Sequence, residues 1–169
     1  MQIISIICRL ACACWFGGAA LFTFVLTPVI FASYSRDVAG GIVGVLFPGY
    51  FRWGLACGVV TLFCLLVSEG RRHRAPVWIL FAMLVATAIQ AFVIEPQAAR
   101  LKGKISSFEK TAPDHPLRQE FRRLHGLSAA GNLSVIAGGA IVLVLLPGGR
   151  KRKNEDLTSR GRLADPGQP

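Results

Sequence analysis

The sequence predicts an all-α protein, a four-helix transmembrane bundle in which the third and fourth helices extend beyond the membrane. Two observations predict this fold. Of the 169 residues, 53% are hydrophobic and 17% are charged, whereas ordinary soluble domains have about 25% charged residues. The charges are also segregated, so that four long apolar stretches remain, each able to cross about 30 Å of hydrocarbon.

We expect one membrane domain over residues 1–149 and a basic, disordered tail over residues 150–169, because that tail is polar and charged. The membrane spans are expected at about residues 10–31, 41–67, 76–95 and 125–146. A polar turn at residues 33–38 separates the first two spans, and a tight basic loop at residues 69–75 separates the next two.

The second span is the least regular of the four, because Arg52 interrupts it and Pro48 lies inside it. One interpretation is a single long helix that tolerates Pro48 as a kink. The other is a short interfacial helix followed by a short span. We favour the single helix, since neither half alone reaches the roughly 20 residues that a span needs.

Residues 97–124 form the only sizeable hydrophilic connection. Apolar residues recur there at helical spacing in two sets, Leu101, Ile105 and Phe108, then Leu117, Phe121 and Leu124. This pattern predicts helical extensions of the third and fourth spans that meet at residues 113–116. An amphipathic helix lying on the membrane surface is the competing interpretation.

The net charge of +10 comes from basic residues that stand beside the apolar stretches, in clusters at residues 71–74, 100–104, 118–123 and 150–153. This distribution is typical of juxtamembrane anchors, so the expected partner is the lipid bilayer and nucleic acid is not expected. The two densest clusters lie on the side of the termini. We therefore predict an integral protein of a bacterial inner membrane with cytoplasmic termini.

Polar residues within the apolar stretches mark a candidate functional site. His125, Ser128 and Asn132 are spaced i, i+3, i+7 and share one helix face. Ionisable groups inside membranes typically serve a function, so one interpretation is a site for a substrate, an ion or a proton. The alternative is a structural role, in which these residues hold helix ends together. The candidate cluster comprises Arg52, Glu95, Arg122, His125, Ser128 and Asn132.

The five cysteines offer a second, weaker candidate. Cys8 and Cys12, and likewise Cys57 and Cys64, can each share a helix face, and soft thiolates suit Cu(I). We favour small buried hydrophobes instead, because no Cys-x-x-Cys spacing occurs. No cofactor is therefore predicted from the residues.

Glycine spacing predicts close packing of helices, within the bundle or between copies in a homo-oligomer. The pairs that carry this spacing are Gly17 with Ala20, Gly40 with Gly44, and Gly54 with Gly58.

Three segments carry a family resemblance: Leu46-Phe47-Pro48-Gly49-Tyr50-Phe51, Glu95-Pro96, and Phe121-x-Arg123-x-His125-Gly126-Leu127-Ser128-x-x-x-Asn132. Over roughly residues 10–146 the chain resembles the eukaryotic transmembrane protein 205 family and its bacterial relatives. The resemblance implies a four-helix membrane protein without an established activity. Its motif residues here are Phe47, Pro48, Tyr50, Pro96, Phe121 and Gly126.

A more distant similarity runs to copper-resistance protein D and to HemJ-type haem-pathway oxidases. It implies His125 as a haem or copper ligand, although no second histidine lies within a span. The leading interpretation is thus a non-enzymatic integral membrane protein that handles a small solute or metal, or has a structural role. The alternative is a haem- or copper-dependent membrane oxidoreductase.

Overall fold

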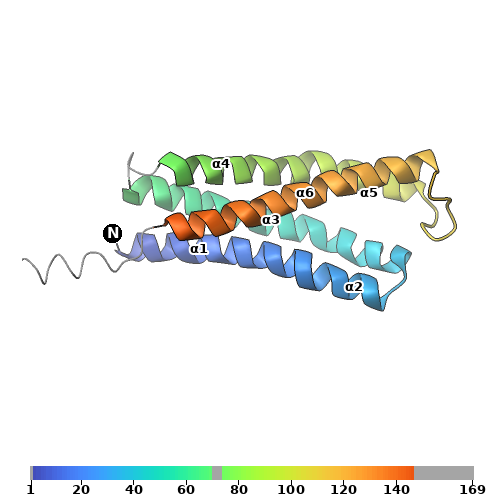
Figure 1. Ribbon diagram of the computed structural model, residues 1–169, viewed down its shortest axis with the longest axis horizontal. Helices are drawn as coiled ribbons and strands as arrows, with labels where there is room; N and C mark the ends of the chain where they lie inside the picture. The colour runs from blue at the N-terminus through green and yellow to red at the C-terminus, as the bar shows by residue number, and fades with distance from the viewer. Residues whose placement is uncertain (1, 70–73, 147–169) are drawn as a thin grey trace, which may run out of the picture.

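The computed structural model describes residues 2–69 and 74–146, which form an elongated helical bundle (Figure 1). Four helical stretches are long and apolar enough to span a membrane, with mean hydropathies between 1.8 and 2.4, so the predicted four-helix fold is confirmed. In chain order the elements are α1 (Gln2–Leu21), η1 (Phe22–Leu26), α2 (Thr27–Ser33), α3 (Arg36–Glu69), α4 (Arg74–Ile89), η3 (Gln90–Ile94), α5 (Glu95–Lys104) and α6 (Pro116–Leu145).

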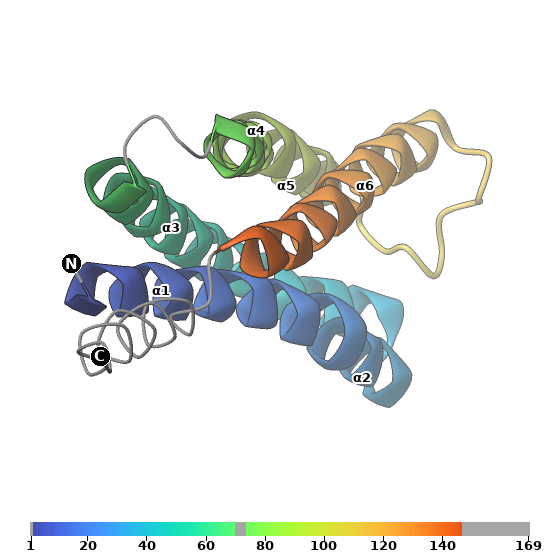
Figure 2. The same ribbon diagram turned by 60° about the vertical axis from the view of Figure 1, so that its left-hand side comes forward.

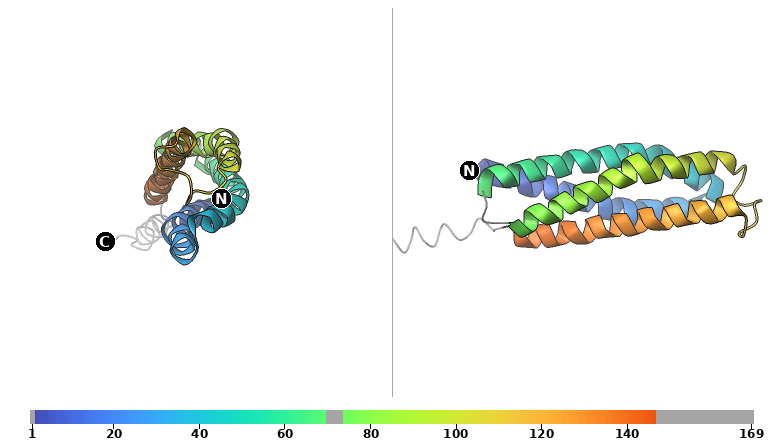
Figure 3. Two further views of the ribbon diagram at one scale, coloured as in Figure 1. Left: turned by 90° about the vertical axis from the view of Figure 1, so that its right-hand side faces the viewer. Right: turned by 90° about the horizontal axis from the view of Figure 1, so that it is seen from above.

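The four long helices form a ring in which α1 packs against α3 and α6, and α4 packs against the same two helices. Figure 3 shows this ring along the bundle axis. Residues 2, 69, 74 and 146 lie at one end, here called the terminal end, and residues 34–35 and 105–115 lie at the other, the loop end. At the loop end α2 packs on α3 and α5 packs on α6, and these two pairs diverge (Figure 2).

Two helix boundaries differ from the predicted ones. The first helix begins at Gln2, well before residue 10, and the polar turn is restricted to residues 34–35 because α3 already begins at Arg36. Asp37 in the first turn of α3 favours this early start, since a carboxylate stabilises a helix N-terminus. The tail at 150–169 and most of the basic loop at 69–75 lie outside the described residues.

α3 runs without interruption from Arg36 to Glu69 with Pro48 inside it. Of the two interpretations of this stretch, the single long helix is therefore the one observed.

The connection between α5 and α6 is only partly as predicted. Both helices extend toward the loop end, but α5 ends at Lys104 and residues 105–115 form a loop, so the extensions do not meet and no surface helix forms. Ile105 has extended backbone angles, φ −96° and ψ 109°. Beyond it, the N–H of Phe108 donates to Asp37 of α3 over 2.7 Å. This long-range hydrogen bond replaces the helix that the local apolar spacing favoured.

A widened, π-helical turn precedes Pro28 in the first long helix and Pro96 in the third. The N–H of Thr27 donates to the carbonyl of Phe22, and the N–H of Glu95 donates to that of Gln90. A proline has no N–H to donate and its ring clashes with the carbonyl four residues before it, so a wider turn relieves the crowding.

The two widened turns reveal that the chain consists of two similar halves, α1–α3 and α4–α6. The segments Phe24-Val25-Leu26-x-Pro28 and Phe92-Val93-Ile94-x-Pro96 match each other. Each half is an antiparallel helical hairpin whose first helix carries the widened turn. Because α1 and α4 each pack between α3 and α6, they occupy opposite corners of the ring.

The cysteines belong to the apolar core of the terminal end. Cys8, Cys12, Cys57 and Cys64 are buried there together with Trp15 and other apolar side chains, whereas Cys14 is exposed. This environment agrees with cysteine as a small buried hydrophobe.

Some of the glycine pairs mark close approaches within the bundle. A Cβ added at Gly58 would lie 2.6 Å from Leu84 Cδ2 and from Trp15 Cζ3, closer than real Cβ atoms come to other atoms. At Gly17, by contrast, an added Cβ would meet nothing within 4 Å. Gly58 is therefore required for helix contact inside the bundle, and Gly17 is not.

We predict that Gly58→Ala destabilises the bundle by about 1–3 kcal/mol, because the buried ring of Trp15 has no space to move away. Thermal unfolding in detergent micelles would show a lower midpoint for Gly58→Ala than for wild type. Gly17→Ala is the matched control and should unfold like wild type or at a slightly higher temperature. Equal midpoints for the two variants would contradict the prediction.

Candidate functional site

A layer of uncharged polar side chains joins the helices near the middle of the bundle. The hydroxyl of Tyr50 on α3 donates to Asn132 Oδ1 on α6, and Asn132 Nδ2 donates to the hydroxyl of Thr23 in η1. Because the hydrocarbon region offers no water as a partner, such groups have to satisfy one another. Asn132 thereby ties three of the four long helices together.

The fourth long helix joins this layer through Gln90, which is 2% exposed. The hydroxyl of Ser128 donates to Gln90 Oε1 over 3.3 Å, and Gln90 Nε2 donates to the carbonyl of Ala86. Gly131 permits this arrangement, because a Cβ there would lie 2.9 Å from the amide of Gln90. Thr23 and Gln90 both lie in the widened turns, so each turn contributes one polar side chain that contacts α6.

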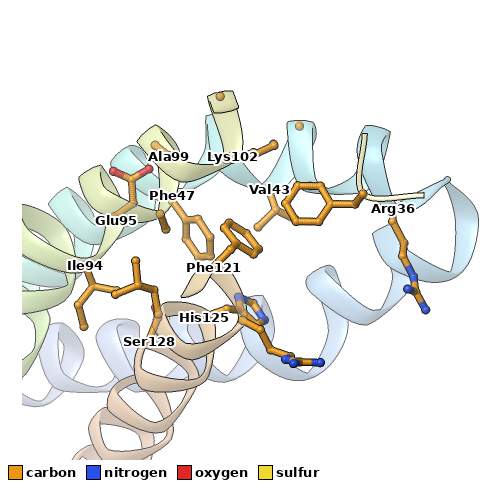
Figure 4. A pocket seen from close by; sticks show the side chains of 18 of the residues that line it. Arg36, Val43, Phe47, Ile94, Glu95, Ala99, Lys102, Phe121, His125 and Ser128 are labelled. Carbon is orange, nitrogen blue, oxygen red and sulfur yellow. The ribbon is translucent and has the colours of Figure 1, made fainter. Parts of the chain in front are cut away.

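Beyond the polar layer, toward the loop end, a cavity of about 770 Å³ lies between the diverging pairs α2–α3 and α5–α6. The aromatic side chains of Phe47 on α3 and Phe121 on α6 point into it (Figure 4). Equivalent positions of the two halves line this cavity: Thr27 and Glu95 each precede the proline of a widened turn, and both are lining residues.

The two walls of the cavity differ in charge. Basic residues line it at Arg36, Lys102, Arg118 and Arg122, and within residues 2–69 and 74–146 the only acidic lining residue is Glu95. Three of these four basic residues belong to the α5–α6 side. The facing wall on α2 and α3 is formed chiefly by glycine and apolar side chains: Phe31, Gly40, Gly41, Val43, Gly44, Val45, Phe47 and Phe51.

Lys102 reaches from α5 across to α3. A Cβ added at Gly40 or at Gly44 would lie 3.6 Å from its Nζ. The ammonium group therefore lies directly over these two glycines, at the distance of ordinary van der Waals contact from an added Cβ.

Asp37 links α3 to the 105–115 loop beside the cavity. Its Oδ2 accepts a hydrogen bond of 2.6 Å from the hydroxyl of Ser107, and its Oδ1 accepts the N–H of Phe108. The ring of Phe108 packs on Phe121, with centroids 4.9 Å apart. These contacts fix the 105–115 loop against α3 and hold the two helix pairs at a set separation.

The predicted polar cluster is divided between these two sites. Glu95, Arg122, His125 and Ser128 line the cavity. Asn132 belongs to the polar layer, and Arg52 is exposed and lines no part of the cavity. The carboxylate of Glu95 points away from the imidazole of His125 (Figure 4). That imidazole stacks on the ring of Phe121 at a centroid distance of 6.3 Å.

The motif residues are also distributed. Phe47 and Phe121 line the cavity and Tyr50 belongs to the polar layer. Pro48 lies inside α3, Pro96 lies in the first turn of α5, and Gly126 is exposed with open space around its Cα.

Sequence reasoning missed five residues of these sites. Thr23 and Gln90 of the polar layer were not expected, although Gln90 is the only amide in the third apolar stretch and this was a usable signal. Lys102 and Arg118 of the cavity were predicted only as juxtamembrane charge, and Arg36 was not part of the predicted candidate cluster. No local pattern places their side chains around one space.

Within residues 2–69 and 74–146, no three His, Cys, Asp or Glu side chains come close enough together to hold a metal ion. His125 is the single imidazole that lines the cavity. Tight copper sites in proteins usually combine several nitrogen or sulfur ligands, so the described residues do not form such a site by themselves.

Four apolar helices of this length define an integral membrane protein, with a mixed polar and apolar cavity at one end of its bundle. Residues 10–107 match the family described as domain of unknown function DUF4149, and the chain belongs to that family. The match covers α1 through α5, including both widened turns. It supports a family of unknown function and does not extend to transmembrane protein 205, copper-resistance protein D or HemJ-type proteins.

One relative is an uncharacterized protein of Aquifex aeolicus (strain VF5), which is 27% identical over 131 residues. The alignment covers 76% of this chain and 87% of that protein. No solved structure matches the chain significantly.

We predict that Asn132→Leu and Tyr50→Phe each destabilise the bundle by about 1 kcal/mol or less, the magnitude measured for hydrogen bonds between membrane helices. The double variant should lose less stability than the two single losses added together, because both substitutions remove one shared bond. Unfolding in mixed micelles measures all three variants. Strict additivity would show that the two side chains act independently.

Proposed function

We propose that this protein binds a small amphipathic solute of the bilayer in the cavity between α2–α3 and α5–α6. The cavity itself carries the proposal. Its volume of about 770 Å³ falls within the range of about 300–1,000 Å³ in which proteins bind small molecules. Its lining also combines aromatic and aliphatic surface with a few polar groups, as ligand sites do.

The sequence around the cavity supports a position at the membrane surface. Glu95 ends the apolar stretch of α4 and η3, and residues 118–123 of α6 carry four charged side chains. The opposite wall stays apolar up to Arg36. A molecule with a polar head and an apolar body can therefore satisfy both walls at once.

The rim offers a route of entry from the bilayer. Val45 and Phe31 line the cavity and are nevertheless 82% and 43% exposed. These side chains lie on the lipid-facing side of a spanning helix, since water would not favour so much exposed apolar surface. Lateral entry between the helix pairs follows from this placement.

We also propose that the chain is related to transmembrane protein 205. We propose further that it resides in a bacterial inner membrane and that its termini face the cytoplasm. The basic residues beside the terminal end support this orientation. A carboxy-terminal fusion to green fluorescent protein should fluoresce and a fusion to alkaline phosphatase should be inactive. The opposite pair of results would reverse the orientation.

A second candidate, a haem- or copper-dependent oxidoreductase, rests on His125, because its imidazole lines a large cavity. Among the described residues it would be the sole histidine ligand there, which favours solute binding over a bis-histidine haem. A Soret band, or stoichiometric copper, that is lost in His125→Ala would support this candidate. Purified protein that takes up neither haem nor copper when they are supplied would exclude it.

The proposed binding is tested with a photoactivatable solute, hexadecanol that carries a mid-chain diazirine, in phosphatidylcholine nanodiscs. We predict that light attaches this probe to peptides of the cavity walls. Gly41→Phe should lower the attachment several-fold, because Gly41 lines the cavity and an added Cβ there meets nothing within 4 Å.

Gly17→Phe is the matched control, since Gly17 also has open space around it and does not line the cavity. Attachment to the cavity peptides should be unchanged in this variant. Probe that attaches evenly over the lipid-facing helices, with no difference between the two variants, would contradict the proposal.

A further inference from the structure

We infer that the solute is an acidic single-chain amphiphile, whose carboxylate or phosphate head lies at Lys102 and whose alkyl chain lies along the glycine-lined wall of α3. This inference rests on the proposed function, because it names the class of molecule that the same cavity takes up. Its physical basis is the charge, the free donors and the shape of the lining.

The lining has an excess of positive charge. Among the described residues, the lining includes four basic side chains, those of Arg36, Lys102, Arg118 and Arg122, and one carboxylate, that of Glu95. Near a low-dielectric wall such an excess attracts an anion more strongly than it would in water. A cationic or zwitterionic occupant would leave this charge unbalanced.

The charges are also ordered along the cavity. Lys102 follows Glu95 by two helical turns on the same stretch of helix, which is about 10 Å along the axis. Arg36 lies at the loop end, in the first turn of α3, and Arg118 donates a hydrogen bond to the carbonyl of Thr111 in the loop. The basic end of the cavity is therefore the loop end, and an acidic head is favoured there and disfavoured beside Glu95.

The ammonium of Lys102 has hydrogen-bond donors available at the loop end of the cavity. Asp37 interacts electrostatically with it, but both carboxylate oxygens of Asp37 already accept hydrogen bonds from Ser107 and Phe108. Within the part of the chain that the structure describes, no hydrogen bond or ion pair engages the ammonium of Lys102. An ammonium held over two glycines, with unused donors, is well placed for an anionic oxygen.

The remaining wall accommodates an alkyl chain. Gly41 lines the cavity and has open space around it, and Val43 and Phe47 line the same wall on α3. This surface leads to Val45 at the exposed rim. A single chain can therefore lie in the cavity while its end remains in the bilayer, so the occupant is a membrane amphiphile and not a free inorganic anion.

The two halves of the chain also differ in charge at equivalent positions. Where the second half places Glu95, the first half places the uncharged Thr27, and where the second half places Lys102, the first half places Tyr34. Only the second half thus supplies charge at these positions, which fixes one orientation for a bound amphiphile.

The test compares four diazirine probes with the same hexadecyl chain and different heads: hexadecanoic acid, hexadecyl phosphate, hexadecanol and hexadecylamine. Each is present at equal mole fraction in phosphatidylcholine nanodiscs that contain the full-length protein. We predict that the two acidic probes attach to the cavity peptides about tenfold more than the alcohol, as one charge-assisted hydrogen bond provides. The amine should attach less than the alcohol.

Lys102→Gln should lower the attachment of the two acidic probes to the level of the alcohol and leave the alcohol unchanged. Lys102→Arg should retain most of the preference, because the charge is kept. Lys104→Gln is the matched control, since Lys104 is exposed, lies on the same helix and does not line the cavity. This control should behave as wild type.

Three results would overturn the inference in different ways. All four probes could attach equally and still be blocked by Gly41→Phe. This result would support the proposed solute binding and contradict a preference for an acidic head. Displacement of hexadecyl phosphate by inorganic phosphate would show a site for free anions. Absence of cavity attachment with every probe would remove the proposed function together with the inference.

Discussion

The hydrogen bonds of Asn132 are the interaction on which the arrangement of the bundle depends. They join the side chains of Thr23 and Tyr50, so that α6 is held against η1 and α3 at one fixed depth. On the terminal side of this layer the helices pack closely through glycine and cysteine positions. On the loop side the pairs diverge and the cavity opens. Ser128, which donates to Gln90 in the polar layer, also lines the cavity, so the layer and the cavity adjoin at this residue.

This layer lies where two widened turns occur, and a proline follows each of those turns. Each turn lies immediately before the residue pair that ends in Pro28 or Pro96, and each contributes one polar side chain toward α6. The widened turns and the polar contacts to α6 therefore occur at the same depth of the bundle.

Local sequence pattern predicted the helices well, since the apolar stretches and their length are a direct consequence of the bilayer. It predicted less well how the helices face each other. Arg52 follows Tyr50 by two residues, which is about 200° around the helix, and so it is exposed while Tyr50 points inward. The prediction that helices extend through residues 105–115 was wrong for a similar reason. The hydrogen bonds that hold this loop on Asp37 join residues about 70 positions apart. Hydropathy contains no information on the rotation of Arg52 around its helix or on the hydrogen bonds of Asp37.

Two glycine pairs with the same spacing have different roles in the structure. Gly54 and Gly58 lie against the buried ring of Trp15, so their missing side chains allow α1 and α3 to approach. Gly40 and Gly44 have the same spacing on the same helix, but what fills their space is the ammonium of Lys102 from α5. In the first case the glycines bring apolar surfaces together. In the second they lie beneath a cation that lines the cavity between α2–α3 and α5–α6.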